Sequence, residues 1–166
     1  MKNPRWTALA VVALLVVVVD QLVKLVIRRE FQLYDSVPVI PDFFSLTRIH
    51  NTGAAFGMLD GSEIPYKSVI LTSVRIVVLG VLAVFAGTLP TAHRLARVGL
   101  ALVLGGAVGN LVDGLMLGYV VDFLDFYWGA WHFWAFNVAD ASISVGMALV
   151  ILDQIGVGQQ RVSGTV

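Results

Sequence analysis

Long apolar runs separated by short polar segments dominate the chain, and four of these runs are long enough to form membrane-spanning helices. They cover about residues 6–27, 68–89, 95–117 and 136–155. A helix needs roughly 20 mainly apolar residues to cross a hydrocarbon core about 30 Å thick. The pattern therefore predicts an all-α membrane protein with four transmembrane helices, in which residues 1–166 form a single domain.

The connection between the first two runs, about residues 28–67, has a different character. It contains turn-forming residues such as Pro38, Pro41 and Gly53, and an extended-looking stretch at Phe43–Ile49. Short apolar stretches bounded by proline and glycine are typical of strands and turns. We therefore expect a small strand-containing cap here, and a loose C-terminal tail at residues 157–166.

Composition supports lipid as the solvent and excludes several functions. Hydrophobic residues make up 58% of the chain and charged residues 13%, which would leave large apolar patches on a soluble domain of this size. The net charge is zero and no long basic run is present, so the chain lacks the electrostatic signature of a nucleic-acid-binding protein. The absence of cysteine excludes disulfides, thiolate metal sites and a cysteine nucleophile.

Basic residues near the ends of the apolar runs predict the orientation. Lys2 and Arg5 precede the first run, and His93, Arg94 and Arg97 lie between the second and third. Lysine and arginine concentrate on the cytoplasmic side of membrane proteins. Both termini are therefore expected in the cytoplasm, with the 28–67 loop on the opposite face.

Charged and amide side chains interrupt three of the apolar runs. Each such group costs about 2.5–3.5 kcal/mol near the centre of a membrane helix, so its presence needs a reason. The pairs are spaced three or four residues apart, which places both members on one side of a helix. They are Asp20 with Lys24, Asn110 with Asp113, and Asn137 with Asp140. The first pair is either a structural ion pair or part of a site.

Two other features of the apolar runs are interpreted as structural. Gly105, Gly106 and Gly109 precede Asn110, and small residues let helix backbones approach closely in lipid. Arg75 lies within the second run, where its long side chain can extend toward the membrane surface.

Asp122 and Asp140 form the most promising candidate site. Asp122 directly follows the third run and Asp140 lies near the start of the fourth, so the intervening loop can bring both carboxylates to the outer interface. Two adjacent carboxylates share a proton and can act as general base and general acid. Asp125, three residues further on, is interpreted as a loop acid. The arrangement suits peptide hydrolysis by an aspartate pair, but intramembrane acids also form proton relays.

Two rival functions therefore stay open at this point. One is a small proton-coupled transporter or channel component, with Asp20, Asp113 and Asp140 as a relay. The other is a non-catalytic scaffold, which would tolerate loss of Asp122.

Several motifs, in order along the chain, resemble those of bacterial lipoprotein signal peptidase, also called signal peptidase II. They are Asp20 with Lys24, the string NTGAAF at 51–56, the string GGAVGNLVD at 105–113, Val121–Asp122–Phe123, and FNVAD at 136–140. The resemblance spans nearly the whole chain. It implies a four-helix aspartic endopeptidase that removes the signal peptide from diacylglyceryl-modified prolipoproteins by cleaving before the lipidated cysteine.

The resemblance also implies the surroundings of the enzyme. It would be a multi-pass protein of the bacterial inner membrane, with cytoplasmic termini, a strand-containing periplasmic cap and an active site near the periplasmic face. Its partners would be the prolipoprotein substrate and membrane lipid, and it would act as a monomer without metal or organic cofactor.

By motif position, Asp122 and Asp140 match the catalytic pair of the family. The positions that match supporting or substrate-binding residues are Asp20, Lys24, Asn51, Gly53, Gly106, Asn110, Asp113, Asn137 and Ala139. Two positions depart from the pattern, since Gly114 stands where the family usually has arginine and Trp134 where it often has proline. Glycine cannot offer a guanidinium to substrate carbonyls, so we expect weaker substrate binding or compensation by another residue.

Overall fold

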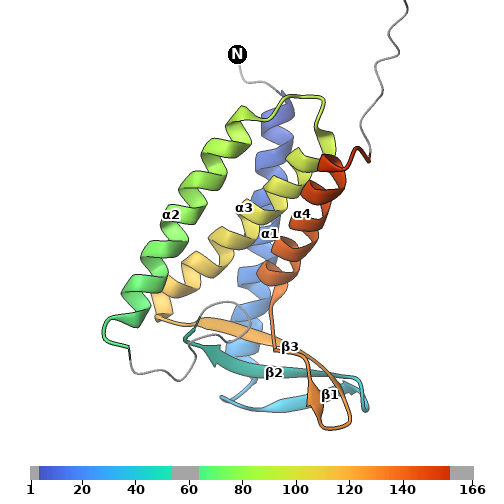
Figure 1. Ribbon diagram of the computed structural model, residues 1–166. Helices are drawn as coiled ribbons and strands as arrows, with labels where there is room; N and C mark the ends of the chain where they lie inside the picture. The colour runs from blue at the N-terminus through green and yellow to red at the C-terminus, as the bar shows by residue number, and fades with distance from the viewer. Residues whose placement is uncertain (1–3, 54–63, 158–166) are drawn as a thin grey trace, which may run out of the picture.

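A computed structural model describes residues 4–53 and 64–157, which form a bundle of four helices with a small sheet at one end (Figure 1). The elements are α1 (Pro4–Glu30), β1 (Ser36–Ile40), β2 (Phe44–Asn51), α2 (Lys67–Thr88), α3 (Arg94–Leu117), β3 (Val120–Trp128), β4 (Trp131–His132) and α4 (Val138–Gln154). Residues 54–56 of the NTGAAF string and nearly all of the expected tail lie outside the described residues.

Three of the four expected spanning helices have the length and apolarity that a bilayer requires. These are α1, α2 and α3, and their outward side chains are exposed, as for Leu14 at 61% and Val84 at 71%. The fourth, α4, has 17 residues and is shorter than expected, so four transmembrane helices are not confirmed. It begins at Val138 and not at Phe136, because the Phe136 backbone pairs with Leu124 of β3.

The sheet is larger than the sequence predicted. Its strands follow the order β1-β2-β3-β4 with antiparallel pairing throughout. The expected strand at Phe43–Ile49 corresponds to β2, whereas β3 and β4 come from the connection between α3 and α4 that was expected to be a loop. Gly118 ends α3 with a positive φ of 78°, which glycine adopts without strain, and the chain then turns directly into β3.

Glycines on α3 allow close packing with helices on two sides, as the sequence predicted. A Cβ atom on Gly105 would lie 2.7 Å from the carbonyl oxygen of Ala13 in α1. Gly99 and Gly146 face each other between α3 and α4, and a Cβ on either would lie 2.5 Å from the other's carbonyl oxygen. The helix contacts therefore depend on the absence of side chains at these positions.

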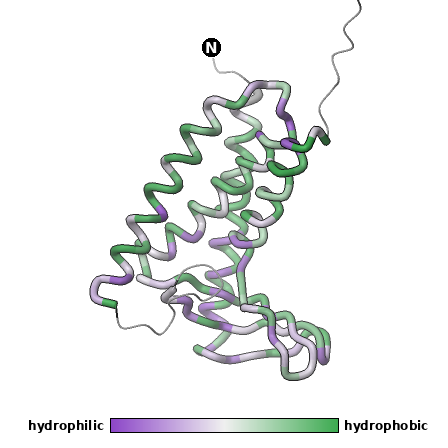
Figure 2. The backbone as a smooth tube through the Cα atoms, in the orientation of Figure 1, coloured by the Kyte–Doolittle hydropathy of each residue, from purple (hydrophilic) through white to green (hydrophobic). Residues whose placement is uncertain are grey.

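The sheet packs against the lower end of α1 in Figure 1 through a small apolar core. Ile27 of α1 and Val121 and Phe123 of β3 are almost fully buried there. Figure 2 shows the helices as mainly hydrophobic, with hydrophilic positions gathered where the helices meet the sheet. The fold thus brings most of its buried polar residues to the junction between the membrane helices and the sheet.

The Gly99–Gly146 contact generates a stability prediction. Gly146→Ala should destabilise the protein by about 1–3 kcal/mol, because the added methyl group overlaps the Gly99 carbonyl and the α3–α4 contact must open. Thermal unfolding in detergent would measure the change. Gly80→Ala on α2 is the matched control, since a Cβ there meets nothing within 4 Å, and should be neutral or slightly stabilising. Equal effects of the two substitutions would contradict this account of the packing.

Candidate functional site

Buried polar side chains from every helix and two strands meet at the junction between the bundle and the sheet. Residues from α1, α3 and α4 supply most of them, and β2 and β3 supply one each. They are Asp20, Lys24, Asn51, Asn110, Asp113, Asp122, Asn137 and Asp140, all of which the sequence had marked as candidates. Arg75 of α2 adds a further charge beside them.

Lys24 lies at the centre of this cluster, and its ammonium group has no solvent exposure. Its Nζ atom lies 2.8 Å from Asp20 Oδ2 and 3.0 Å from Asp113 Oδ2. It also donates a hydrogen bond of 3.0 Å to Asn110 Oδ1. A buried charge is tolerated only when it is paired and hydrogen-bonded, and three oxygen partners meet that requirement. Asp20 and Lys24 thus form the expected ion pair, which extends from α1 to α3.

The carboxylates around Lys24 are themselves held by backbone and amide donors. The Ala139 N–H donates to Asp20 Oδ1 at 2.9 Å, and the Val121 N–H donates to Asp113 Oδ2 at 3.0 Å. Gln21 Nε2 donates to Asp113 Oδ1 at 3.0 Å. These bonds connect α1 and α3 to the first turn of α4 and to β3. The bond from the Ala139 N–H to Asp20 gives Ala139 the supporting role that its motif position predicted.

Asp122 projects from β3 and is 2% exposed. Its two carboxylate oxygens accept hydrogen bonds from amide side chains, at 2.7 Å from Asn137 Nδ2 and 3.0 Å from Asn51 Nδ2. Burial, and secondly the nearby Asp140 carboxylate, raise the pKa of Asp122 to about 7, against the opposing effect of both amides. The Asp122 carboxyl is therefore poised to hold or release a proton near neutral pH.

Asp140 lies in the first turn of α4, where Asn137 is the N-cap. The Asp140 N–H donates to Asn137 Oδ1 at 2.9 Å, and the Asn137 N–H donates to Asp140 Oδ2 at 3.3 Å. The other oxygen, Oδ1, accepts from Asn110 Nδ2 at 2.7 Å. Because the Asn137 side chain also binds Asp122, this one residue fixes both acids of the candidate pair.

Asn51 connects this pair to the loop that follows β2. Its Oδ1 atom accepts from the Gly53 N–H at 2.9 Å, and the Gly53 carbonyl accepts from Arg75 Nη2 at 3.1 Å. The Arg75 guanidinium therefore belongs to the rim of the site and does more than extend toward the membrane surface. A Cβ atom on Gly114 would lie 2.9 Å from Arg75 Nη1, so the guanidinium uses space that glycine leaves open.

The small residues marked in the sequence serve the contact between α3 and its neighbours. A Cβ on Gly106 would meet the backbone oxygen of Ala139 and lie 2.8 Å from Ile143 Cγ1, and one on Gly109 would lie 2.7 Å from Asp20 Oδ2. Gly106 and Gly109 therefore bring α3 close enough for Asn110 and Asp113 to reach their partners.

Sequence reasoning missed Gln21 and the position of Arg75. The amide of Gln21 in an apolar run is itself a signal, because such a group is costly in lipid without a partner. Asp125 lies apart from the cluster, where it pairs with His132 at 3.0 Å, and Trp134 is 62% exposed. Within residues 4–53 and 64–157, no three histidine, aspartate or glutamate side chains are grouped so that they could hold a metal ion.

Comparison with known proteins assigns this arrangement to a family. The family model described as "Signal peptidase (SPase) II" matches residues 12–156. A lipoprotein signal peptidase of Geobacter metallireducens is 43% identical over 153 residues, which are 92% of this chain and 93% of that protein. One from Syntrophotalea carbinolica is 45% identical over 156 residues, which cover 93% of this chain and 94% of that protein.

Two solved structures share the fold, and both are described as bacterial membrane enzymes. One has a TM-score of 0.79 at 30% identity and covers 96% of this chain and 94% of its own. The other has a TM-score of 0.74 at 31% identity, with 90% and 94% covered. Motif order, the buried aspartate cluster, the relatives and the shared fold agree, and the chain belongs to the signal peptidase II family.

Proposed function

We propose that this chain is an aspartic endopeptidase that removes signal peptides from diacylglyceryl-modified prolipoproteins, with Asp122 and Asp140 as the catalytic pair. Membership of the signal peptidase II family supports a protease that acts on prolipoproteins. The observation that carries the aspartic mechanism is the double role of Asn137, which binds Asp122 through its side-chain amide and Asp140 through a capping box.

The chemistry follows from one proton shared by the two carboxyl groups. The ionised carboxylate takes a proton from a water molecule, whose oxygen forms a bond to the scissile carbonyl carbon. The protonated carboxyl gives its proton to the carbonyl oxygen, which yields a neutral gem-diol. Collapse of the gem-diol breaks the C–N bond. One gem-diol hydroxyl gives its proton to the ionised carboxylate as the C=O bond re-forms, the amine leaves with the proton of the other carboxyl group, and the pair again holds one proton. No covalent acyl-enzyme is formed.

The cluster around Lys24 supports this role and disfavours a proton relay. A relay through Asp20, Asp113 and Asp140 would need all three carboxylates to exchange protons with water or with one another. The Asp20 and Asp113 carboxylates are instead engaged by Lys24, by backbone N–H groups and by Gln21. They position the helices that carry Asn110 and Asp140, and Asp122 and Asp140 are left as the reacting pair.

The position of the pair fits a lipidated substrate. Asp122 belongs to β3 and Asp140 to the first turn of α4, so both lie at the end of the bundle that carries the sheet. Figure 2 shows hydrophilic positions gathered at this end of the mainly hydrophobic helices. The acyl chains of a diacylglyceryl group would stay in the lipid beside the helices while the peptide lies across the interface. We place this end at the periplasmic face of the inner membrane, with α4 as the fourth spanning helix, both termini in the cytoplasm and a monomer as the active unit.

Substitution of either acid should abolish cleavage. Asp122→Asn and Asp140→Asn each remove the shared proton chemistry, so the rate of cleavage of a diacylglyceryl-modified prolipoprotein should fall by more than about a hundredfold. The assay uses purified full-length protein in mixed detergent and lipid micelles, with gel detection of the released signal peptide.

Asp125→Asn is the matched control, because it makes the same change on the same strand at an acid bonded only to His132 among the described residues. It should cleave like the wild type. Wild-type cleavage by Asp122→Asn or Asp140→Asn would show that these two aspartates are not the catalytic pair. The proposed function would be wrong if the wild type did not cleave the modified prolipoprotein. It would also be wrong if the wild type cleaved a prolipoprotein without the diacylglyceryl group equally well.

Burial of Asp122 should make stability depend on pH. Its pKa is about 7 in the folded protein and about 3.9 in an unfolded chain, so the folded state keeps a proton that the unfolded state has lost. This stabilisation is complete below about pH 4 and is lost as the pH rises through 7. The melting temperature should therefore fall from pH 5 to pH 8 more steeply for the wild type and Asp125→Asn than for Asp122→Asn. Equal slopes would contradict a raised Asp122 pKa.

A further inference from the structure

A second polar group is buried at the opposite end of the bundle, far from the aspartates. Arg97 lies in the first turn of α3 and is 7% exposed. Sixteen residues separate it from Asp113 on the same helix, which corresponds to about 24 Å at 1.5 Å per residue. Most of the thickness of a bilayer therefore lies between Arg97 and the proposed catalytic end.

The guanidinium of Arg97 lacks the partners that its burial requires. Its Nε and Nη2 atoms are buried without a hydrogen bond, and no acid of the described chain forms an ion pair with it. The contact it does make is with the ring of Trp6, whose centroid lies 4.5 Å from Cζ. A cation over an aromatic ring gains only part of what an ion pair supplies, so Arg97 has no counter-ion among residues 4–53 and 64–157.

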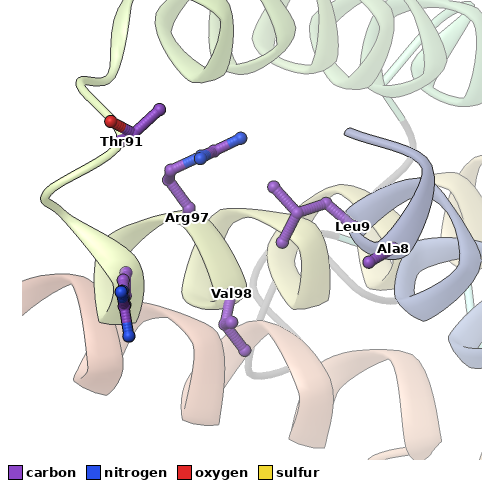
Figure 3. Close-up of a pocket in the computed structure, with 6 residues that line it drawn as sticks. Ala8, Leu9, Thr91, Arg97 and Val98 are labelled. Carbon is purple, nitrogen blue, oxygen red and sulfur yellow. The ribbon is translucent and has the colours of Figure 1, made fainter. Parts of the chain in front are cut away.

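Two adjoining cavities border the same side chain. One has a volume of about 290 Å³ and is lined by Ala8, Leu9, Thr91, Arg94, Arg97 and Val98. Figure 3 shows the Arg97 side chain extending into it between Thr91 and Leu9. The second, of about 190 Å³, is bordered by apolar residues of α1, α2 and α3, including Ala13, Ala86 and Leu104. The first cavity suits the charged headgroup of an amphipathic molecule, and the second suits its hydrocarbon tail.

We infer that this is a binding site for an anionic phospholipid, with the phosphate at Arg97 and Arg94 and an acyl chain in the apolar cavity. The Thr91 hydroxyl can donate to a phosphate oxygen, and the N-terminus of α3 adds its positive dipole end. Basic pockets between helices at a membrane surface have the chemistry that phospholipid headgroups need. The bound lipid would supply the counter-ion that the described residues do not provide.

Lipid retention by the purified protein tests this site. Delipidated full-length protein is incubated with phosphatidylglycerol or phosphatidylcholine and examined by native mass spectrometry and thermal unfolding. The wild type should retain phosphatidylglycerol at least about tenfold better and gain several degrees in melting temperature from it. Arg97→Met should lose both effects while it keeps peptidase activity, and Arg29→Gln, which removes an exposed arginine at the other end of α1, should keep them.

Arg97→Lys, which keeps the charge, should retain part of the preference and guards against a general packing defect of the methionine variant. Equal retention of the two lipids by the wild type would overturn the site. So would an unchanged preference for phosphatidylglycerol in Arg97→Met. An equal stabilisation by inorganic phosphate alone would assign the site to a free anion and overturn the lipid.

A second, independent observation concerns Arg75 of α2 and Gly114 of α3, which lie side by side. The Arg75 guanidinium lies in the space beside Gly114, where a Cβ would be 2.9 Å from Nη1 and 3.3 Å from Thr72 Oγ1. Arg75 comes from α2, whose neighbouring side chains Val74 and Ile76 are 53% and 49% exposed. Its guanidinium turns inward, toward the space that a side chain at 114 would otherwise occupy.

Arg75 also has donors to spare within the described chain. One N–H is used by the Gly53 carbonyl, and no carboxylate lies within ion-pairing distance. Its positive charge nevertheless lies near enough to the carboxylates of Asp140, Asp113 and Asp122 to interact with them electrostatically. A guanidinium beside the acids, held by one bond and with free N–H groups, is suited to bind peptide carbonyl oxygens.

We propose that Arg75 binds backbone carbonyls of the substrate. This proposal rests on the peptidase function proposed above. Arg75→Gln should raise the KM for the prolipoprotein by about tenfold or more with a smaller effect on kcat, since one charge-assisted hydrogen bond is lost while Asp122 and Asp140 remain.

Relocation of the guanidinium provides the sharper test. The double variant Arg75→Gln with Gly114→Arg should recover a lower KM than Arg75→Gln alone, whereas Gly114→Arg beside an intact Arg75 requires only that the Arg75 side chain shift. Arg29→Gln is the charge-matched control and should leave KM unchanged. A wild-type KM in Arg75→Gln, or no recovery in the double variant, would overturn the role of Arg75. Cleavage by Asp122→Asn would instead overturn the peptidase proposal itself.

Discussion

The ammonium group of Lys24 holds the polar end of the helix bundle together. It lies within 3.0 Å of oxygens from Asp20, Asp113 and Asn110, and none of these charges has more than 1% exposure. Removal of one partner from such a buried group costs about 3–5 kcal/mol, because the remaining charge stays out of water. α1 and α3 are therefore fixed in register where Asn110 reaches Asp140, and the geometry of the acids follows from this contact.

Two kinds of packing meet at the site. On the side of the helix bundle, glycines of α3 bring helix backbones together in a region where lipid offers no hydrophobic driving force. On the side of the sheet, Ile27, Val121 and Phe123 form an apolar core between α1 and β3. The buried polar cluster lies between these regions, and its hydrogen bonds to the Ala139 and Val121 backbones join one to the other.

The helices and most of the polar cluster were predictable because long apolar runs and charged side chains within them leave a clear signal. The strand β3 was not, since Val120–Trp128 follows a membrane helix and its aromatic residues also suit a membrane interface. Its pairing with β2 and β4 makes it a strand. The start of α4 was misplaced for the same reason, because Phe136 pairs with Leu124. The inward turn of Arg75 depends on Gly114, which lies far away in sequence and has no periodic signature.

The two acids bound by Asn137 come from different layers of the molecule, Asp122 from the sheet and Asp140 from the helix bundle. Neither layer alone brings the carboxyl groups together, and the amide that joins them is the first residue before α4. The two carboxyl groups are therefore adjacent only when the sheet is packed on the helices, so the intact contact between these two layers is a condition for the candidate pair to exist.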